Sequence, residues 1–352
     1  MPRTAKDDRP SRRRFVPART IGAILLAWAV PAAAASAIPC VWTGVERIVA
    51  VGDLHGDYDN FVDIMKATGM VDERLHWAGG RTHFVQTGDI LDRGPAARKI
   101  LEFLMRIEVE AALDGGKVHV LLGNHEALNL AGIAFDYPGY VNVDQFLSFL
   151  PAEYKDRLVS RAPASEVERA AYWAKILRSD KEAQAAYTRA FVEDFGPWLL
   201  KRNCVEKIND VVFVHGGISL KYAGWDLAKI NAVLRDELSF LSEPVKNPRI
   251  LALFRPQIVY DRIGPLWYRD LAQRDETEFA PEVDRILALL GARAMIVAHS
   301  PQIGSPIALE YMSRFQKRIW VIDTGITAAY GGRLSALIID KGQFSVWGDE
   351  DE

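Results

Sequence analysis

Short apolar runs that end in a cluster of Asp, His, Asn and Gly recur along this 352-residue chain, and they constrain its fold more than any other feature. The runs occupy residues 47–51, 84–86, 118–122, 211–214, 295–298 and 319–322. Their length and their β-branched content predict strands. Because ligands of α/β folds bind at the edge where the strands leave the sheet, we expect the polar clusters to meet there in one site.

The distribution of histidines supports this interpretation. Four of the seven directly follow such a run: His55, His125, His215 and His299. The others are His76, His83 and His119. His119 lies in the middle of a predicted strand, so we expect it to be a core histidine whose ring nitrogens have partners.

The densest cluster is the stretch from Gly88 to Gly94, which follows the strand predicted at residues 84–86. Within seven positions it holds two carboxylates, Asp89 and Asp92, and a guanidinium, Arg93. This set suits a metal bound by Asp89 and a phosphate bound by Arg93, with the glycines allowing close backbone approach. Taken alone, the stretch has one alternative interpretation, an ordinary surface turn rich in Gly and Asp.

Two further clusters carry potential metal ligands. Asp53 and His55 are two residues apart, so in an extended backbone they point to the same side. Asn124 and His125 follow the strand predicted at residues 118–122. An amide oxygen can ligate a metal, and the neighbouring imidazole can transfer a proton.

The first 37 residues have the layout of a secretory signal. A basic segment, Ser11 to Phe15, precedes an apolar stretch and a small-residue site that ends at Ala37. The arginines also resemble a twin-arginine export signal. We therefore expect a periplasmic or secreted protein without stable membrane insertion after cleavage. The alternative is an uncleaved N-terminal membrane anchor.

Charge and cysteine content narrow the function classes. Residues 1–37 hold seven basic and two acidic residues, so the remaining chain has 36 basic and 44 acidic residues, a net charge of −8. Such an acidic protein is a poor candidate for binding nucleic acid. Cys40 and Cys204 match no zinc motif. They either form a disulfide in an exported protein or remain two separate thiols.

We expect a domain from residue 38 to residue 347, followed by an acidic tail at residues 348–352. Residues 127–205 carry no comparable polar cluster, and helical patterns dominate there. We interpret this segment as a helical insertion that acts as scaffold or covers the site.

The ordered motifs resemble those of the calcineurin-like metallophosphoesterases, in particular the PPP-type protein phosphatases. They are Gly52-Asp53-Leu54-His55-Gly56, Gly88 to Gly94, Gly123 to Glu126, and His215-Gly216-Gly217. The later pieces Lys207 to Asp210, Gly264 to Arg269, Asp323-Thr324-Gly325 and Tyr330-Gly331-Gly332 resemble the bacterial, Shewanella-like protein phosphatases. The resemblance implies an α/β (α+β) fold, with two packed mixed β-sheets flanked by helices.

The resemblance also implies roles. Asp53, His55 and Asp89 would hold one metal. A second would be held by Asp89, which bridges the two, and by Asn124, His215 and His299. His125 would be the general acid, oriented by Asp92, while Arg93 and Arg269 would bind phosphate oxygens. Eukaryotic relatives place the second phosphate-binding arginine elsewhere, so the candidates here are Arg255, Arg262 and Arg269. The sequence Trp267-Tyr268-Arg269 favours Arg269.

On this resemblance, a metal-bridging hydroxide would attack phosphorus and His125 would protonate the leaving oxygen. Oxygen and imidazole ligands suit manganese, iron or zinc, and family resemblance favours manganese. We expect a metal-dependent phosphomonoesterase that acts on phosphorylated proteins or peptides. The alternatives are an exported nucleotide or dinucleoside-polyphosphate hydrolase of the same superfamily, and a metal-binding protein without turnover.

For the substrate, we expect phosphotyrosine to be preferred over phosphoserine, since some Shewanella-like enzymes are tyrosine-directed. Phe135, Tyr137, Tyr140 and Phe146 follow the His125 motif closely. They would form either an aromatic wall that stacks on a phenol ring or the core of the insertion.

Overall fold

The computed structural model describes residues 38–243 and 253–348, and every structural statement below concerns these residues. The predicted signal segment and the acidic residues 349–352 lie outside them. From Ile38 onward the chain forms one compact unit. Among the described residues, no helix combines the length and the hydropathy needed to span a bilayer.

Two mixed β-sheets form the centre of this unit, as the family resemblance implied. The first has the order β1 (Val41–Trp42), β5 (Val205–Ile208), β6 (Val211–Val214), β7 (Ala294–Val297), β9 (Ile319–Val321) and β8 (Ser313–Arg314). The second has the order β11 (Gln343–Gly348), β10 (Ser335–Asp340), β2 (Arg47–Val51), β3 (His83–Gln86) and β4 (Lys117–Val120). The neighbours β2, β3 and β4 are parallel, as are β6, β7 and β9. Their carboxyl ends therefore reach one edge within each sheet.

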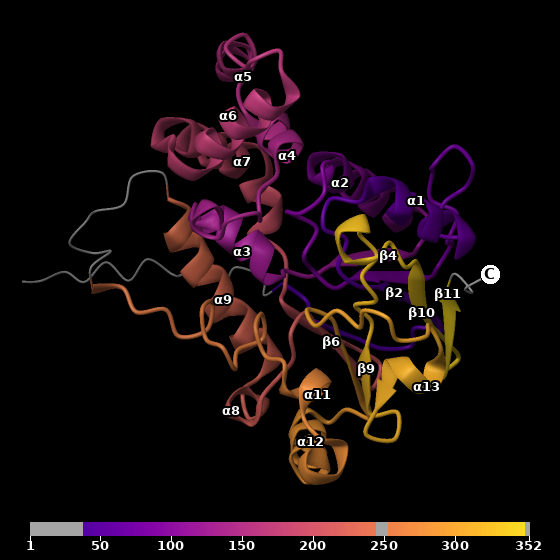
Figure 1. Ribbon diagram of the computed structural model, residues 1–352. Coiled ribbons are helices and arrows are strands. Elements are labelled where there is room, and N and C mark those ends of the chain that lie inside the picture. The colour runs from indigo at the N-terminus through magenta and orange to yellow at the C-terminus, as the bar shows by residue number, and fades with distance from the viewer. Residues whose placement is uncertain (1–37, 244–252, 349–352) are drawn as a thin grey trace, which may run out of the picture. The chain divides into compact units, whose positions relative to one another are not determined.

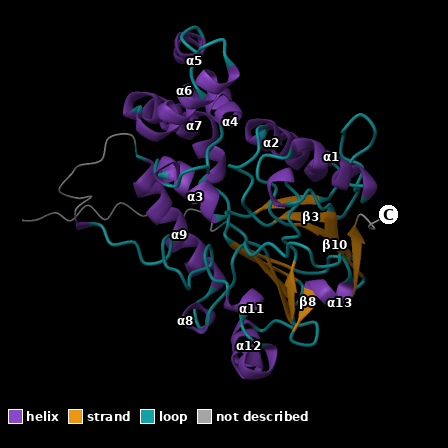
Figure 2. Ribbon diagram, viewed as in Figure 1, coloured by secondary structure: helices purple, strands orange, loops and turns teal. Residues whose placement is uncertain are grey.

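Helices cover the outer faces of the sheets (Figures 1 and 2). In the first half of the chain they are α1 (Tyr58–Ala67), α2 (Ala97–Leu113), α3 (Asn124–Ala131), α4 (Val143–Phe149), α5 (Ala152–Val159), α6 (Glu166–Ser179) and α7 (Lys181–Leu199). In the second half they are α8 (Leu220–Ala223), α9 (Leu227–Ser242), α11 (Asp270–Gln273), α12 (Glu276–Leu290) and α13 (Leu309–Met312). Two short 3₁₀ turns, η1 (Ala134–Asp136) and η2 (Ala328–Tyr330), complete the set.

The strands β2, β3, β4, β6, β7 and β9 are buried on both faces over nearly their whole length, which explains their continuous apolar sequences. Ile48 and Ala50 of β2 pack between the sheets against residues such as Phe213 and Ile296. Alternate residues, such as Val49, belong to a second cluster together with helical side chains. Because side chains of a strand alternate between faces, one run supplies both cores.

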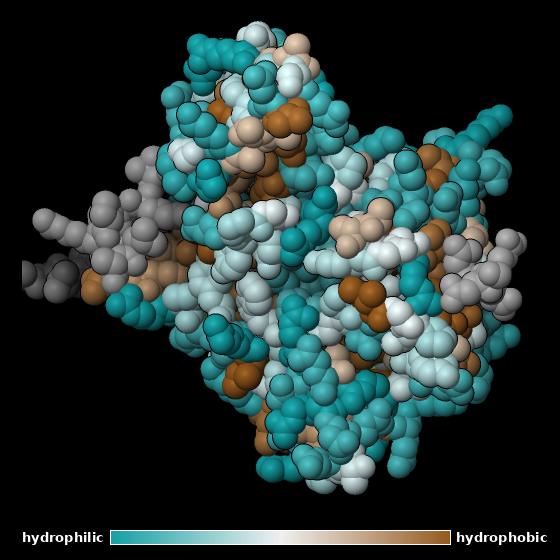
Figure 3. Space-filling view, viewed as in Figure 1, coloured by the Kyte–Doolittle hydropathy of each residue, from teal (hydrophilic) through white to brown (hydrophobic). Residues whose placement is uncertain are grey.

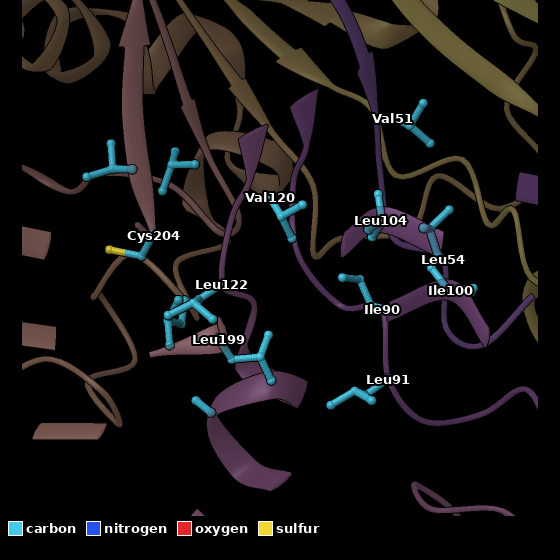
Figure 4. Close-up of a cluster of buried hydrophobic side chains, with 14 of the residues drawn as sticks. Val51, Leu54, Ile90, Leu91, Ile100, Leu104, Val120, Leu122, Leu199 and Cys204 are labelled. Carbon is cyan, nitrogen blue, oxygen red and sulfur yellow. The ribbon is translucent and has the colours of Figure 1, made fainter. Parts of the chain in front are cut away.

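The second cluster also anchors the loops that leave the strands. Leu54 follows β2, and Ile90 and Leu91 follow β3; all three are fully buried. Figure 4 shows them beside Ile100 and Leu104 of α2. Apolar side chains inside the polar motifs therefore hold these loops against the core.

The histidines that do not follow strands lie elsewhere. His119 is buried, and its Nδ1 lies 2.5 Å from Glu206 Oε2, while its Nε2 lies 2.9 Å from His83 Nδ1. Both ring nitrogens therefore have partners, as expected for a core histidine. His76 is exposed and contacts Glu110.

Cys40 and Cys204 are buried free thiols in this structure. Both hydrogen-bond to the side chain of Asn231 on α9, and Cys204 Sγ lies 3.4 Å from its Oδ1. Cys40 and Cys204 thus both contact Asn231 although they are 164 positions apart in the sequence, and a disulfide between them stays a prediction.

Candidate active site

The site begins with the loop from Gly88 to Gly94 that follows β3. Gly88 has φ of +99°, and a Cβ at this position would lie 2.5 Å from the backbone nitrogen of Gly123. Only glycine tolerates both the left-handed backbone and this close approach. The close approach brings the Asp89 loop against the start of α3, where Asn124 and His125 lie.

Glu126 holds this loop in place. Its buried carboxylate accepts hydrogen bonds from the backbone N–H groups of Asp89 at 2.8 Å, Ile90 at 2.9 Å and Leu91 at 3.3 Å. It also accepts one from Gly123 at 2.8 Å. A single side chain thus satisfies four backbone donors of two motifs, which compensates for burying its charge.

Several candidate site residues adopt left-handed backbone conformations that are rare for residues other than glycine. They are His55, Asp89, Asp92, Arg93 and His299, with φ between 43° and 71°. Such conformations persist where the surroundings hold them, and they cluster at functional sites.

The first ligand group lies where β2 and β3 end. His55 Nδ1 lies 2.9 Å from the carbonyl oxygen of Leu91, which orients the ring. Its Nε2 lies 3.9 Å from Asp53 Oδ2 and 3.9 Å from Asp89 Oδ2. Burial, and next the nearby His125, lower the pKa of His55 to about 4, so it is neutral and able to ligate a metal.

The second ligand group centres on His215, directly after β6. Its Nε2 lies 3.0 Å from Asn124 Oδ1, 3.1 Å from His299 Nδ1 and 3.3 Å from Asp89 Oδ2. His215 Nδ1 lies 3.0 Å from the carbonyl oxygen of Thr87, which fixes the ring. Four side chains from four strand ends therefore converge on one point.

These residues fit two metal ions. Asp89 belongs to both potential metal-binding groups, one with His55 and His125 and one with His215 and His299. The Nε2 atom of His299 is buried without a hydrogen-bond partner among the described residues. Burial, and then the neighbouring His215, keep the pKa of His299 well below its ordinary value, which leaves a neutral imidazole. A shared carboxylate flanked by neutral imidazoles is a suitable donor set for divalent ions.

The carboxylate of Asp323 also belongs to this centre. It follows β9 and hydrogen-bonds to Asp53, and both groups are buried. Burial, and next the neighbouring Asp323, raise the pKa of Asp53, while burial raises the pKa of Asp323 to about 6. Adjacent buried carboxylates repel each other when both are ionised, and a bound cation relieves that repulsion.

His125 and Asp92 form the expected pair. His125 Nδ1 lies 2.6 Å from Asp92 Oδ2, and its Nε2 lies 3.8 Å from Asp89 Oδ2. Burial opposes the charged imidazolium, but Asp89 and Asp92 outweigh this effect and raise the pKa of His125. The ring is thus held with one nitrogen on a carboxylate and the other facing the ligand groups.

Asp92 is held in turn by the helical segment. Gln145 of α4 donates from Nε2 to Asp92 Oδ1 at 2.7 Å and accepts the Asp92 backbone N–H at 2.6 Å. Asn129 of α3 donates to both carboxylate oxygens, at 3.1 and 3.2 Å. The hydroxyl of Tyr187 on α7 bridges these amides, donating to Asn129 Oδ1 at 2.8 Å and accepting from Gln145 Nε2 at 2.9 Å.

Arg93 lies among tyrosines at the mouth of the site. Its guanidinium carbon is 4.3 Å from the ring centre of Tyr140 and 5.8 Å from that of Tyr330. One terminal nitrogen donates to the carbonyl oxygen of Gly139 at 3.3 Å, and Nε is buried without a partner among the described residues. The remaining donors suit a phosphate oxygen.

The second arginine is Arg269, at the start of α11. Its guanidinium donates to the carbonyl oxygen of His299 and to Ser300 Oγ, the latter at 3.2 Å. Arg262 and Arg255 are exposed, whereas Arg269 is partly buried. Of the three candidates, Arg269 is the one beside the metal-binding groups.

The aromatic wall divides into two parts. Tyr140 stacks on His125, with ring centres 4.4 Å apart, and Tyr137 stacks on Tyr140 at 5.1 Å. Phe146 is fully buried and packs with Phe135, 5.9 Å away, inside the helical segment. Of the two alternatives for these four residues, the wall therefore fits Tyr137 and Tyr140, whereas Phe146 is core and the partly buried Phe135 packs against that core.

Sequence reasoning assigned no role to five residues of this site: Glu126, Asn129, Gln145, Tyr187 and Asp323. Two carried a usable signal, because Glu126 lies inside a polar motif and Asp323 directly follows a predicted strand. Asn129, Gln145 and Tyr187 carried none, since each lies within a helix whose sequence pattern does not show what the helix contacts.

Comparison with known proteins agrees with this geometry. The calcineurin-like phosphoesterase family profile matches residues 46–302. Shewanella-like protein phosphatase 1 of Plasmodium berghei is 27% identical over 293 residues, which cover 81% of this chain and 68% of that protein. Shewanella-like protein phosphatase 2 of Arabidopsis thaliana is 34% identical over 200 residues, which cover 54% of this chain and 51% of that protein.

A solved structure shares the fold. The cold-active protein-tyrosine phosphatase of a psychrophilic Shewanella species superposes with a TM-score of 0.64 and 26% identity, over 87% of this chain and 78% of that one. The family profile spans most of this chain and includes all six predicted metal ligands. The chain therefore belongs to the calcineurin-like phosphoesterases, and its relatives place it with the PPP-type, Shewanella-like protein phosphatases.

Proposed function

We propose that this protein is a dimetal phosphomonoesterase that removes phosphate from protein side chains, with phosphotyrosine preferred over phosphoserine. The observation that carries the proposal is the position of His125. Its Nδ1 is held by Asp92 at 2.6 Å, while its Nε2 faces the carboxylate shared by both metal-binding groups. A proton donor therefore lies beside the place where a phosphoryl group would bind.

The ligand sets follow from the two groups of side chains. One ion would be held by Asp53, His55 and Asp89, and the other by Asp89, Asn124, His215 and His299. When bound, such ions supply positive charge to the phosphoryl oxygens and lower the pKa of coordinated water. Manganese, iron and zinc all suit these ligands, and we propose manganese.

The chain's own side chains supply the remaining steps. Arg93 and Arg269 bind the outer phosphoryl oxygens and hold the phosphorus in line for attack. His125 donates the proton on Nε2 to the leaving oxygen, and the hydrogen bond from its Nδ1 to Asp92 keeps the ring in that orientation.

Preference for phosphotyrosine would come from the tyrosines around Arg93. Tyr140 and Tyr330 flank the guanidinium, and Tyr137 is 38% exposed. A phenol leaving group offers these rings a stacking partner, whereas a seryl group does not. The similarity to a protein-tyrosine phosphatase of a Shewanella species supports the same preference.

A substrate panel tests the function. We expect kcat/KM for a phosphotyrosine peptide to exceed that for the matched phosphoserine peptide at least tenfold. Both should exceed the values for ATP and diadenosine polyphosphates. A smaller ratio removes the tyrosine preference, and a preference for a nucleotide makes the protein a nucleotide hydrolase.

The role of His125 is tested by measuring turnover and metal content together. His125→Ala should lower kcat by roughly 10²–10⁴-fold, the usual contribution of a general acid, while the metal content stays near that of the wild type. Asp89→Ala should lose both metals. Because His125 also lies in one potential metal-binding group, loss of metal from His125→Ala would make it a ligand instead.

We also propose that the protein is exported and cleaved after Ala37. The basic, apolar and small-residue order of residues 1–37 supports this location. Sequencing the N-terminus of protein from the periplasmic fraction should yield a chain that starts at Ile38. A chain that retains residues 1–37 and sediments with membranes would support the anchored alternative.

A further inference from the structure

A second recognition element adjoins the site on the far side of Tyr137. From His125, the stacked rings of Tyr140 and Tyr137 lead outward in steps of 4.4 and 5.1 Å. These steps place the Tyr137 ring within ~10 Å of the His125 ring, the length of about three residues of extended chain. Tyr137 is the outermost ring of this stack and is partly exposed.

Beyond Tyr137 the same loop forms one wall of a pocket of about 310 Å³. Phe135, Tyr137 and Val141 line it from the loop, and Ala174, Leu177 and Arg178 line it from α6. The walls of the pocket are therefore mostly carbon surface. The polar groups among these side chains are the hydroxyl of Tyr137 and the guanidinium of Arg178. In Figure 3 hydrophobic residues reach the surface below the lobe that carries α5 and α6.

The walls of this pocket are tied to the catalytic centre. Gly139, which also lines it, accepts a hydrogen bond from the Arg93 guanidinium at 3.3 Å. The backbone N–H of Arg93 donates to the carbonyl oxygen of Tyr140 at 2.8 Å. Phe135 packs edge-on against Tyr187, 5.2 Å away, in the helical core. Two hydrogen bonds thus join the loop that carries Arg93 to the loop that forms one wall of the pocket.

We propose that this pocket binds one large apolar side chain of the phosphorylated polypeptide, two or three residues from the phosphorylated residue. The proposal rests on the proposed protein-phosphatase function and adds a sequence preference to it. The pocket has the volume for one Leu, Met or Phe side chain, and its apolar walls gain from that burial. The contact between its wall and the Arg93 loop places it along the path of an extended substrate.

The chemistry of the pocket favours a peptide over a nucleoside. A base and a ribose bring several donors and acceptors, and the apolar walls would leave most of them without partners. Arg178 lies exposed at the rim and has no ion-pair partner among the described residues. It therefore suits an acidic residue beside the apolar one in the substrate.

The first experiment scans the peptide. In a phosphotyrosine peptide of otherwise constant sequence, Leu replaces Ala at each position from three before to three after the phosphotyrosine. We expect one position, two or three residues from the phosphotyrosine, to raise kcat/KM about tenfold or more, as burial of one such side chain does in an apolar pocket. Asp at that position should not raise it.

The second experiment changes the pocket. Ala174 is exposed on α6, so Ala174→Asp should fold normally while it places a charge in the wall. We expect the Leu-to-Ala preference of the peptide series to fall to within twofold. Val167→Asp is the matched control, because Val167 is 80% exposed on the same helix and outside the pocket. This variant should keep the preference.

The outcomes separate this inference from the proposed function. If no peptide is hydrolysed while an aryl phosphate is, the protein-phosphatase function fails. If peptides are hydrolysed but Leu has less than a threefold effect at every position, the pocket inference fails and the function stands. The inference is also overturned if Ala174→Asp keeps the Leu-to-Ala preference of the peptide series. The same holds if Ala174→Asp lowers nucleotide hydrolysis and leaves that peptide preference unchanged.

Discussion

Replacing Gln145 tests whether the helical segment orients the proton donor. Gln145 is fully buried on α4 and contacts Asp92 twice, through its amide nitrogen at 2.7 Å and its amide oxygen at 2.6 Å. Gln145→Leu keeps similar volume but removes both bonds. Asp92 would retain His125 and Asn129, while its backbone N–H, at φ of 71°, would lose its acceptor.

The expected magnitude follows from these contacts. A hydrogen bond to a charged group contributes about 1.5–3 kcal/mol, and a buried donor without a partner costs about 1–3 kcal/mol. We therefore expect the free energy of unfolding to fall by roughly 2–5 kcal/mol. General acid catalysis contributes about 10²–10⁴-fold, so a misoriented His125 should lower kcat by roughly 10–100-fold.

The assay compares leaving groups. Phenyl phosphate needs a proton on its departing oxygen, whereas a dinitrophenyl phosphate needs much less help. If Gln145 orients the acid, Gln145→Leu should slow phenyl phosphate hydrolysis at least tenfold more than dinitrophenyl phosphate hydrolysis. Tyr187→Phe removes only the bridging hydroxyl. It should also slow phenyl phosphate hydrolysis more than dinitrophenyl phosphate hydrolysis, but by a smaller factor than Gln145→Leu.

A matched control separates orientation from general damage. Gln184 is a buried glutamine on α7 that donates to the carbonyl oxygen of Leu177, away from Asp92. Gln184→Leu should lose stability without changing the ratio between the two substrates. Equal slowing of both substrates by Gln145→Leu, or an equal change of the ratio in the control, would refute the reasoning.

Three further predictions concern single contacts. Arg269→Ala should weaken inhibition by phosphate or vanadate and lower kcat/KM about tenfold, whereas Arg262→Ala should change neither; the reverse result would reassign the phosphate-binding arginine. Cys40 and Cys204 should form a disulfide when the protein folds in an oxidising compartment, which mass spectrometry without reduction would show; two free thiols in periplasmic protein would contradict it. Gly52→Ala should lower the free energy of unfolding by about 1–3 kcal/mol, because its Cβ would lie 2.4 Å from a carbonyl oxygen at the end of β9; unchanged urea unfolding would argue against this close approach.

Much of the metal centre could be predicted from the sequence. Asp53 and His55 follow the apolar run of β2, which is buried on both faces. They therefore lie where this strand leaves the core. The same local rule placed Asp89, His215 and His299. The position of a strand depends on a few neighbouring residues, and polar side chains that directly follow an apolar run lie at the edge where the strand leaves the sheet.

Only the tertiary structure determined which distant side chains support these ligands. Asp323 meets Asp53 across the two sheets, and Gln145 reaches Asp92 from a helix 53 positions away in sequence. The same holds for Tyr140, which stacks on His125, while Phe146 turns into the core. Periodicity specifies which face of an element a residue occupies but not what packs against that face, because the partner is set by how helices and sheets assemble.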